Sequence, residues 1–156
     1  MNAILIVSIL FCVSYAENSK PIYSEKQINS ILHYQYNLNT SYPDILGVHF
    51  YQNKVGTVLQ LEIESNLNNK EYIFEAMNVL SQVGQYSKKA ISKFIIIDHN
   101  KKLDVPTSFE SDANCAIRYF VKNEITKSTW MKDCLSNSIT QRKIENWSTF
   151  NTEKKQ

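Results

Sequence analysis

The spacing of apolar residues along the chain predicts two long helices. The first is expected to begin at Ser24, because Ser24 and Gln27 form a Ser-x-x-Gln capping box and apolar residues then recur at helical spacing as far as Leu38. The second is expected to extend from Asn69 to about Ile91, where apolar residues form a stripe along one face. Each helix therefore has one face suited to packing against a sheet.

Three further segments have the patterns of strands. Residues 45–52 and 57–65 alternate apolar and polar positions, which is typical of strands with one face in water. The turn residues Asn53 and Lys54 separate them, so the two segments are predicted to form an antiparallel hairpin. Residues 94–97 form an uninterrupted apolar run, which favours a strand that is covered on both faces and lies centrally in the sheet.

The C-terminal third of the chain predicts shorter elements. Residues 103–110 can form a fourth strand. Because Pro106 has no backbone N–H for a strand ladder, this strand is expected at an edge of the sheet or at a bulge. Two short helices follow, and their candidate N-caps are Ser111 or Asp112 and Thr126 or Ser128.

Together these elements predict the α+β class. Their order is α-β-β-α-β-(β)-α-α, with the fourth strand in parentheses because Pro106 weakens it. We expect a mostly antiparallel sheet of three or four strands with the helices packed on one face. One domain is expected over residues 17–136, followed by a polar C-terminal tail over residues 137–156.

The N-terminal residues 1–16 have the pattern of a secretory signal peptide. An uncharged apolar run ends at Val13, and Ser14-Tyr15-Ala16 offers the small residues of a cleavage site, so cleavage is expected after Ala16. The run is shorter than the roughly 20 residues that span a bilayer, so no transmembrane segment is expected after cleavage. The protein is then secreted or periplasmic; in the alternative, it is a lipoprotein anchored through Cys12.

Charge and glycine content exclude several classes of partner. The formal net charge of the chain is +2, which is too close to balance to favour nucleic acid or an anionic membrane as the main partner. Only three glycines are present and no Gly-rich nucleotide motif occurs, so no cofactor is predicted.

The two cysteines that remain after signal cleavage, Cys115 and Cys134, are predicted to form a disulfide. A structural zinc site needs four ligands, and the spacing of this pair is far from the Cys-x-x-Cys motif of thiol oxidoreductases. Closing a loop of this length stabilises the fold by roughly 3 kcal/mol in the chain-entropy model.

The candidates for catalysis are few. Of the three histidines, His33 and His49 are expected on the surface or half-buried, and no pair has the spacing of a helical metal site. Asp98 and His99 follow an apolar strand and form the basis of an alternative reading as a small secreted hydrolase. Adjacent strand residues point to opposite faces, however, which opposes a catalytic dyad.

A cluster of aromatic residues supports the leading interpretation, an exported binding module without enzymatic activity. If exposed, these side chains form a recognition surface for an unknown protein or glycan, since tyrosine combines a large contact area with a polar tip. In the alternative, they cover the sheet edge or the core periphery. The residues of this predicted surface are Tyr34, Tyr36, Tyr42, His49 and Tyr51.

Overall fold

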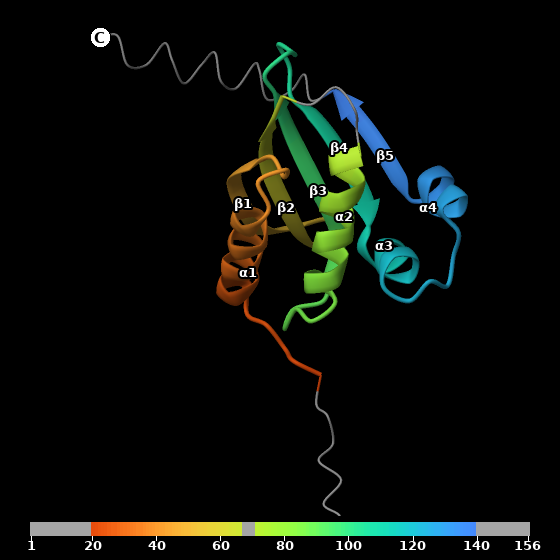
Figure 1. The fold of residues 1–156 in the computed structure, drawn as a ribbon. Helices are drawn as coiled ribbons and strands as arrows, with labels where there is room; N and C mark the ends of the chain where they lie inside the picture. The colour runs from red at the N-terminus through yellow and green to blue at the C-terminus, as the bar shows by residue number, and fades with distance from the viewer. Residues whose placement is uncertain (1–19, 67–70, 140–156) are drawn as a thin grey trace, which may run out of the picture.

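The computed structural model of the protein describes residues 20–66 and 71–139 (Figure 1). The predicted signal peptide, the predicted helix start at Asn69 and the C-terminal tail beyond residue 139 lie outside these ranges. In chain order the elements are α1 (Glu25–Leu38), β1 (Asp44–Asn53), β2 (Gly56–Ser65), α2 (Glu71–Gly84), β3 (Ile91–Asn100), β4 (Thr107–Asp112), α3 (Ala113–Phe120), α4 (Lys127–Asp133) and β5 (Leu135–Ile139).

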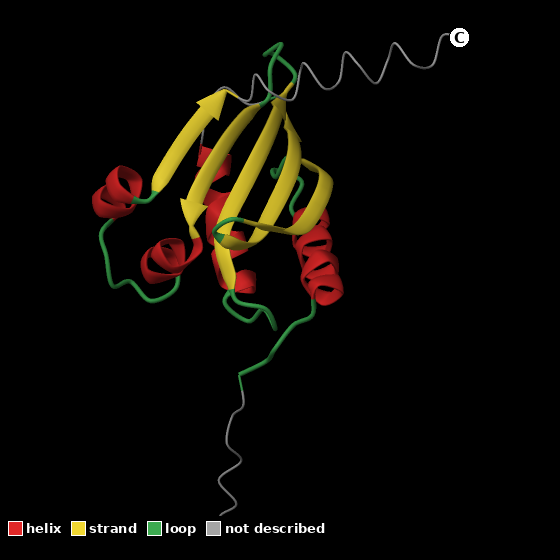
Figure 2. Cartoon of the chain, turned by 180° about the vertical axis from the view of Figure 1, so that it is seen from behind, coloured by secondary structure: helices red, strands yellow, loops and turns green. Residues whose placement is uncertain are grey.

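The strands form one sheet in the order β1-β2-β3-β4-β5. Neighbouring strands are antiparallel except β2 and β3, which are parallel because α2 connects them as a crossover. The helices lie on one face of the sheet, and the view from behind shows no helix in front of the other face (Figure 2). The predicted α+β class and the predicted element order are confirmed, and the sheet has one strand more than expected.

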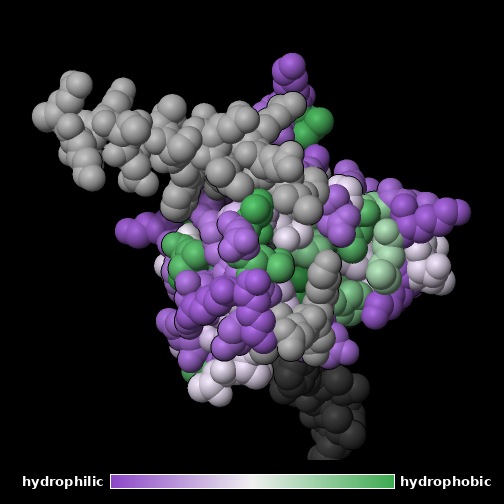
Figure 3. Space-filling model, turned by 90° about the horizontal axis from the view of Figure 1, so that it is seen from above, coloured by the Kyte–Doolittle hydropathy of each residue, from purple (hydrophilic) through white to green (hydrophobic). Residues whose placement is uncertain are grey.

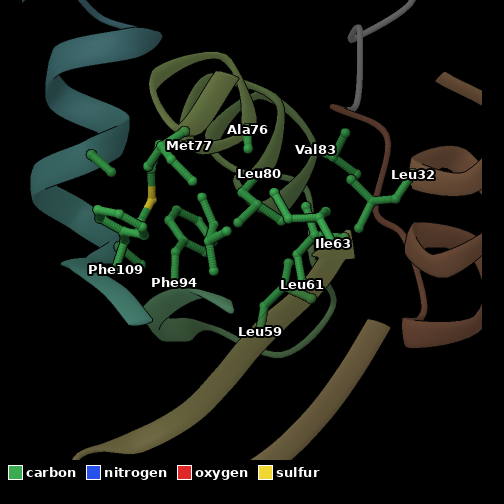
Figure 4. Packing of buried hydrophobic residues seen from close by; sticks show 14 of the residues in the cluster. Leu32, Leu59, Leu61, Ile63, Ala76, Met77, Leu80, Val83, Phe94 and Phe109 are labelled. Atoms are coloured by element: carbon green, nitrogen blue, oxygen red, sulfur yellow. The ribbon is translucent and has the colours of Figure 1, made fainter. Parts of the chain in front are cut away.

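The main core lies between the sheet and the helices α1 and α2 (Figure 4). Strand β2 contributes alternate residues to it, and its side chains at these positions are fully buried. Burying one such aliphatic side chain contributes about 1.5–3 kcal/mol relative to leaving it in water. The central side chains are Leu32 of α1, Leu59, Leu61 and Ile63 of β2, Met77 and Leu80 of α2, and Phe94 of β3.

The opposite face of the sheet has a smaller apolar cluster of Val58, Ile95 and Ile97. All three side chains are buried, so β3 is covered on both of its faces. Since β3 is also the middle strand, the prediction for residues 94–97 is confirmed.

The first helix and the hairpin form as predicted, and local side-chain bonds stabilise the helix start and the turn. Ser24 caps α1 in a capping box with Gln27. In the turn between β1 and β2, the side-chain oxygen of Asn53 accepts hydrogen bonds from the backbone N–H groups of Val55 (2.9 Å) and Gly56 (3.1 Å). Gly56 has a φ of 124°, a conformation that a residue with a side chain rarely adopts.

Helix α2 ends at Gly84, earlier than the predicted end near Ile91, which instead begins β3. A Cβ atom at Gly84 would lie 2.7 Å from the ring of Phe94, so this position packs directly against β3. The next residues leave the helix, and a parallel bridge pairs Ser87 with Tyr23. This long-range backbone pairing replaces the last helical turns that the periodicity predicted.

Strand β4 begins directly after Pro106, so the proline does not interrupt its ladder. The predicted edge position of this strand is wrong, because β5 pairs along its outer side from Leu135 to Ile139. The tail that was predicted from residue 137 therefore begins within β5.

The two short helices are linked covalently. Asp112 caps α3 by accepting a hydrogen bond of 2.8 Å from the backbone N–H of Cys115, and Thr126 caps α4. Cys115 and Cys134 form a disulfide with their Cα atoms 6.2 Å apart, which confirms the predicted pair. The disulfide joins α3 to the residue that precedes β5.

Candidate functional site

A polar cluster on the helix-free face of the sheet is centred on Glu62 of β2. The Nε2 atom of His49 on β1 lies 3.7 Å from one carboxylate oxygen of Glu62, and the Nε2 atom of His99 on β3 lies 3.4 Å from the other. A Cβ atom at Gly47 would lie 2.6 Å from the same His49 nitrogen, so the imidazole lies over this glycine. Three adjacent strands thus bring two histidines to one carboxylate.

The same cluster continues through two further side chains. Gln60 donates a hydrogen bond of 2.7 Å to Glu62, and the hydroxyl of Tyr51 donates one of 3.0 Å to Gln60. Burial, together with the nearby carboxylates of Glu110 and Glu62, raises the pKa of Tyr51. The tyrosine remains a hydrogen-bond donor at neutral pH, and its bond to Gln60 links the side chains of β1 and β2 on this face.

Asp98 lies on the other side of the sheet from His99. Its carboxylate accepts hydrogen bonds from Ser65 (2.7 Å) and from the hydroxyl of Tyr72 (2.5 Å), which belongs to α2. His99 instead faces Glu62. The two residues named for the alternative hydrolase are therefore not brought together.

The predicted aromatic surface is divided among three places. Tyr34 lies on the outer side of α1 and is 65% exposed, whereas Tyr36 is buried and packs against Tyr42 with the ring centroids 5.0 Å apart. His49 and Tyr51 lie on the helix-free face of the sheet, next to the Glu62 cluster. These five residues do not form one continuous surface, and the buried Tyr36 belongs to the core.

A pocket lies between α2, α4 and β5, and we call it the α2–α4–β5 pocket. Its volume is about 640 Å³. Binding sites for apolar groups typically have a volume in this range and walls of mainly apolar side chains. Its apolar lining consists of Ile73, Phe74, Phe109, Trp130, Met131 and Leu135, and its polar rim consists of Glu71, Glu75, Lys127 and Asn137.

The pocket results from incomplete helical cover of the sheet. Helix α4 has only 7 residues and lies at the beginning of β5, so the later part of β5 has no helix over it (Figure 1). In the view from above, hydrophobic residues are visible on the right of the molecule, the side that carries α4 and β5 (Figure 3).

The walls of the pocket are held by packing and by specific bonds. The indole N–H of Trp130 donates a hydrogen bond of 3.0 Å to Ser111, and the ring of Trp130 packs edge-on against that of Phe74. The ammonium group of Lys127 lies 4.3 Å from the centre of the Phe74 ring, a cation–π contact. The Cys115–Cys134 disulfide holds the end of α4 beside α3.

Strand β5 lines the pocket through Leu135 and Asn137 and is the last strand of the sheet among the described residues. Within the described ranges it pairs only with β4, and this ladder has no register shift. Its sequence, Leu-Ser-Asn-Ser-Ile, has no charge and no proline. Edge strands usually carry charged residues or prolines, which prevent pairing with other chains. The opposite edge, β1, has a bulge between Ile45 and Gly47.

The pocket was not predicted from the sequence. Its lining comes from α2, β4, α4 and β5, and no local motif connects these elements. One weak signal was available: Leu135 and Ile139 occur at alternate positions with Asn137 between them, and Ser136 and Ser138 fill the other positions, which is compatible with a short strand.

Comparisons with known proteins give no family. The chain matches no protein-family model, and no curated protein or solved structure is significantly similar to it. In the part of the chain that the structure describes, no helix is long and apolar enough to span a bilayer. Within the same residues, no group of three or more His, Cys, Asp or Glu side chains is arranged to hold a metal ion.

Proposed function

We propose that this protein is an exported binding module without enzymatic activity, and that it binds a protein partner through the α2–α4–β5 pocket. The observation that carries this proposal is an apolar pocket of about 640 Å³ beside β5, which is the last strand of the sheet among the described residues. Exposed apolar concavities of this kind are typical sites of recognition.

Several features support the parts of this proposal. The N-terminal sequence has the pattern of a signal peptide, and the Cys115–Cys134 disulfide is compatible with an oxidising compartment. The lining is mainly apolar, which suits a peptide side chain better than a glycan, whose hydroxyl groups need many polar partners. The hydrolase alternative has no support from the geometry, because Asp98 and His99 face opposite sides of the sheet.

The experiment uses Met131, which lines the pocket and is 49% exposed. The exported protein is immobilised and exposed to extracellular proteins from its source, and the retained proteins are identified by mass spectrometry. Met131→Glu should lose the partner, because a charge in the pocket opposes burial of an apolar group. Leu103→Glu is the matched control, since Leu103 is 57% exposed in the loop between β3 and β4.

Both variants should have the melting temperature of the wild type, so that a loss of binding reports on the pocket. His99→Ala should retain the partner. If Met131→Glu and Leu103→Glu retain the same proteins as the wild type, the pocket is not the binding site.

A further inference from the structure

We propose that Asn39 is a site of N-linked glycosylation, and that the exported protein carries a glycan at the end of α1. Residues Asn39-Thr40-Ser41 have the sequence Asn-x-Ser in which x is not proline, and this is the acceptor sequence for N-glycosylation of secreted proteins. The inference rests on the export that the proposed function includes, and it is independent of the binding pocket.

The acceptor sequence lies in a surface loop. Helix α1 ends at Leu38 and β1 begins at Asp44, so the three residues lie between these elements and outside every strand ladder. Asn39, Thr40 and Ser41 are all exposed. A glycan is bulky and solubilising, so a folded protein accommodates it where the modified side chain stays in water. Asn39 meets this requirement.

The hydrogen bonds of Asn39 are compatible with modification. Its side-chain oxygen Oδ1 accepts hydrogen bonds from the backbone N–H (3.1 Å) and the hydroxyl (2.6 Å) of Ser41. Its backbone N–H donates to the carbonyl of Tyr36 at the end of α1 (3.3 Å). None of these bonds uses the side-chain nitrogen Nδ2, which is the atom that bears an N-linked glycan. A sugar on Nδ2 therefore leaves the local structure in place.

The reaction is a group transfer at this nitrogen. A membrane-bound transferase of the secretory compartment supplies an oligosaccharide that is carried on a polyprenyl pyrophosphate. The bond between C1 of the first sugar and the pyrophosphate oxygen breaks, and a bond between C1 and Nδ2 of Asn39 forms. The proton that Nδ2 loses leaves with the released polyprenyl pyrophosphate, so the amide product is neutral.

A second pocket lies beside Asn39, between the end of α1 and α2, and its volume is about 320 Å³. Its walls combine apolar side chains with side-chain amides. A sugar ring has C–H groups on its faces and hydroxyl groups around its rim, so it needs both kinds of contact. The first sugar of a glycan at Asn39 can therefore pack here. The lining residues are Gln35, Leu38, Asn39, Tyr42, Val79 and Gln82.

Two large apolar side chains beside Asn39 are exposed. Tyr34 and Leu38 are one turn apart on the outer side of α1, and they are 65% and 67% exposed. A glycan at Asn39 shields this pair from contact with other proteins. Helix α1 and the α2–α4–β5 pocket lie on opposite sides of α2, so the glycan leaves that pocket open (Figure 1).

The first test locates the glycan on the natural protein. The exported protein is purified from its source, treated with peptide N-glycosidase and mapped by mass spectrometry. This enzyme releases N-glycans and converts the modified asparagine to aspartate, so we expect aspartate at position 39 after treatment. Peptide mapping is needed because a second Asn-x-Ser sequence begins at Asn146, outside the described residues.

Matched variants test the acceptor sequence. The full chain, with its own N-terminal segment, is produced in a eukaryotic secretory host. Ser41→Thr keeps the acceptor sequence and should carry a glycan at Asn39, whereas Ser41→Ala and Asn39→Gln should carry none there. All three variants should be exported like the wild type, because the substitutions lie in an exposed loop.

The outcomes separate this inference from the proposed function. Natural exported protein with an unmodified Asn39, or with a glycan only at Asn146, would overturn the inference and leave the binding pocket unaffected. A glycan at Asn39 in Ser41→Ala would also overturn it, because the acceptor sequence would not be the signal. Natural protein retained inside the cell would overturn the inference together with the export in the proposed function. Capture with Met131→Glu tests the pocket separately.

Discussion

The hydroxyl of Tyr72 donates a hydrogen bond of 2.5 Å to the carboxylate of Asp98. Tyr72 belongs to the beginning of α2 and Asp98 to the later part of β3, so the bond connects the crossover helix to the central strand. Ser65 of β2 donates a second hydrogen bond of 2.7 Å to the same carboxylate. All three side chains are buried, so this network holds the parallel pair of strands and α2 in one arrangement.

The first prediction concerns this network. Tyr72→Phe removes one donor and leaves a buried carboxylate with fewer partners, so the free energy of unfolding should fall by about 1.5–3 kcal/mol. Chemical denaturation at neutral pH measures the change. Tyr34→Phe is the control, because Tyr34 is 65% exposed and its substitution should change the stability by less than about 0.5 kcal/mol. Equal stability of the two variants would contradict the prediction.

The second prediction is a pH dependence. Burial and the hydrogen bond to Asp98 raise the pKa of Tyr72 in the folded protein. The unfolded chain therefore releases this proton first, and the stability from Tyr72 is present below its unfolded pKa of about 10 and is lost as the pH rises through the folded pKa. The free energy of unfolding should fall more steeply above about pH 10 in the wild type than in Tyr72→Phe. Parallel stability curves in this range would refute the assignment.

The third prediction concerns the disulfide between Cys115 and Cys134. Thiol counting on the denatured, unreduced exported protein should find no free thiol if Cys12 is removed with the signal peptide. The double variant Cys115→Ser and Cys134→Ser should be less stable by roughly 3 kcal/mol. Two reactive thiols in each chain, in protein recovered from an oxidising compartment, would show that the bond does not form in solution.

The fourth prediction compares two glycines. Gly84→Ala places a Cβ atom 2.7 Å from the ring of Phe94, which is fully buried and cannot move freely. The free energy of unfolding of this variant should therefore fall by about 1–3 kcal/mol. Gly47→Ala meets the imidazole of His49 at 2.6 Å, but the side chain of His49 is 52% exposed and can rotate away. We expect the free energy of unfolding of Gly47→Ala to fall by less than about 0.5 kcal/mol. Thermal unfolding of both variants tests the contrast.

Much of the local structure was predictable because its signals lie within a few residues of one another. Ser24 and Gln27 are three positions apart, and their side chains determine where α1 begins. Asn53 bonds to the backbone of the turn that closes the hairpin. The apolar run around Ile96 indicated a central strand, because only a strand covered on both faces needs such a sequence.

Two predictions that depended on distant neighbours failed, namely the end of α2 and the edge position of β4. Helical periodicity continued past Gly84, but α2 ends there and the following residues pair with the backbone near Tyr23. Pro106 suggested an edge strand, yet β4 is internal because β5 returns beside it. Tyr34 and Tyr36 are close in the chain, but the helix turns one toward water and the other into the core.

The sequence alone determined the class of fold, the order of the helices and the first four strands, and the pairing of Cys115 with Cys134. These features depend on periodicity, caps and the number of cysteines, which are properties of short segments or of composition. Tertiary structure alone decided that β5 forms and that α2, α4 and β5 enclose an apolar pocket. A pocket exists only where elements distant in the chain pack without filling the space between them, and no short stretch of sequence specifies that space.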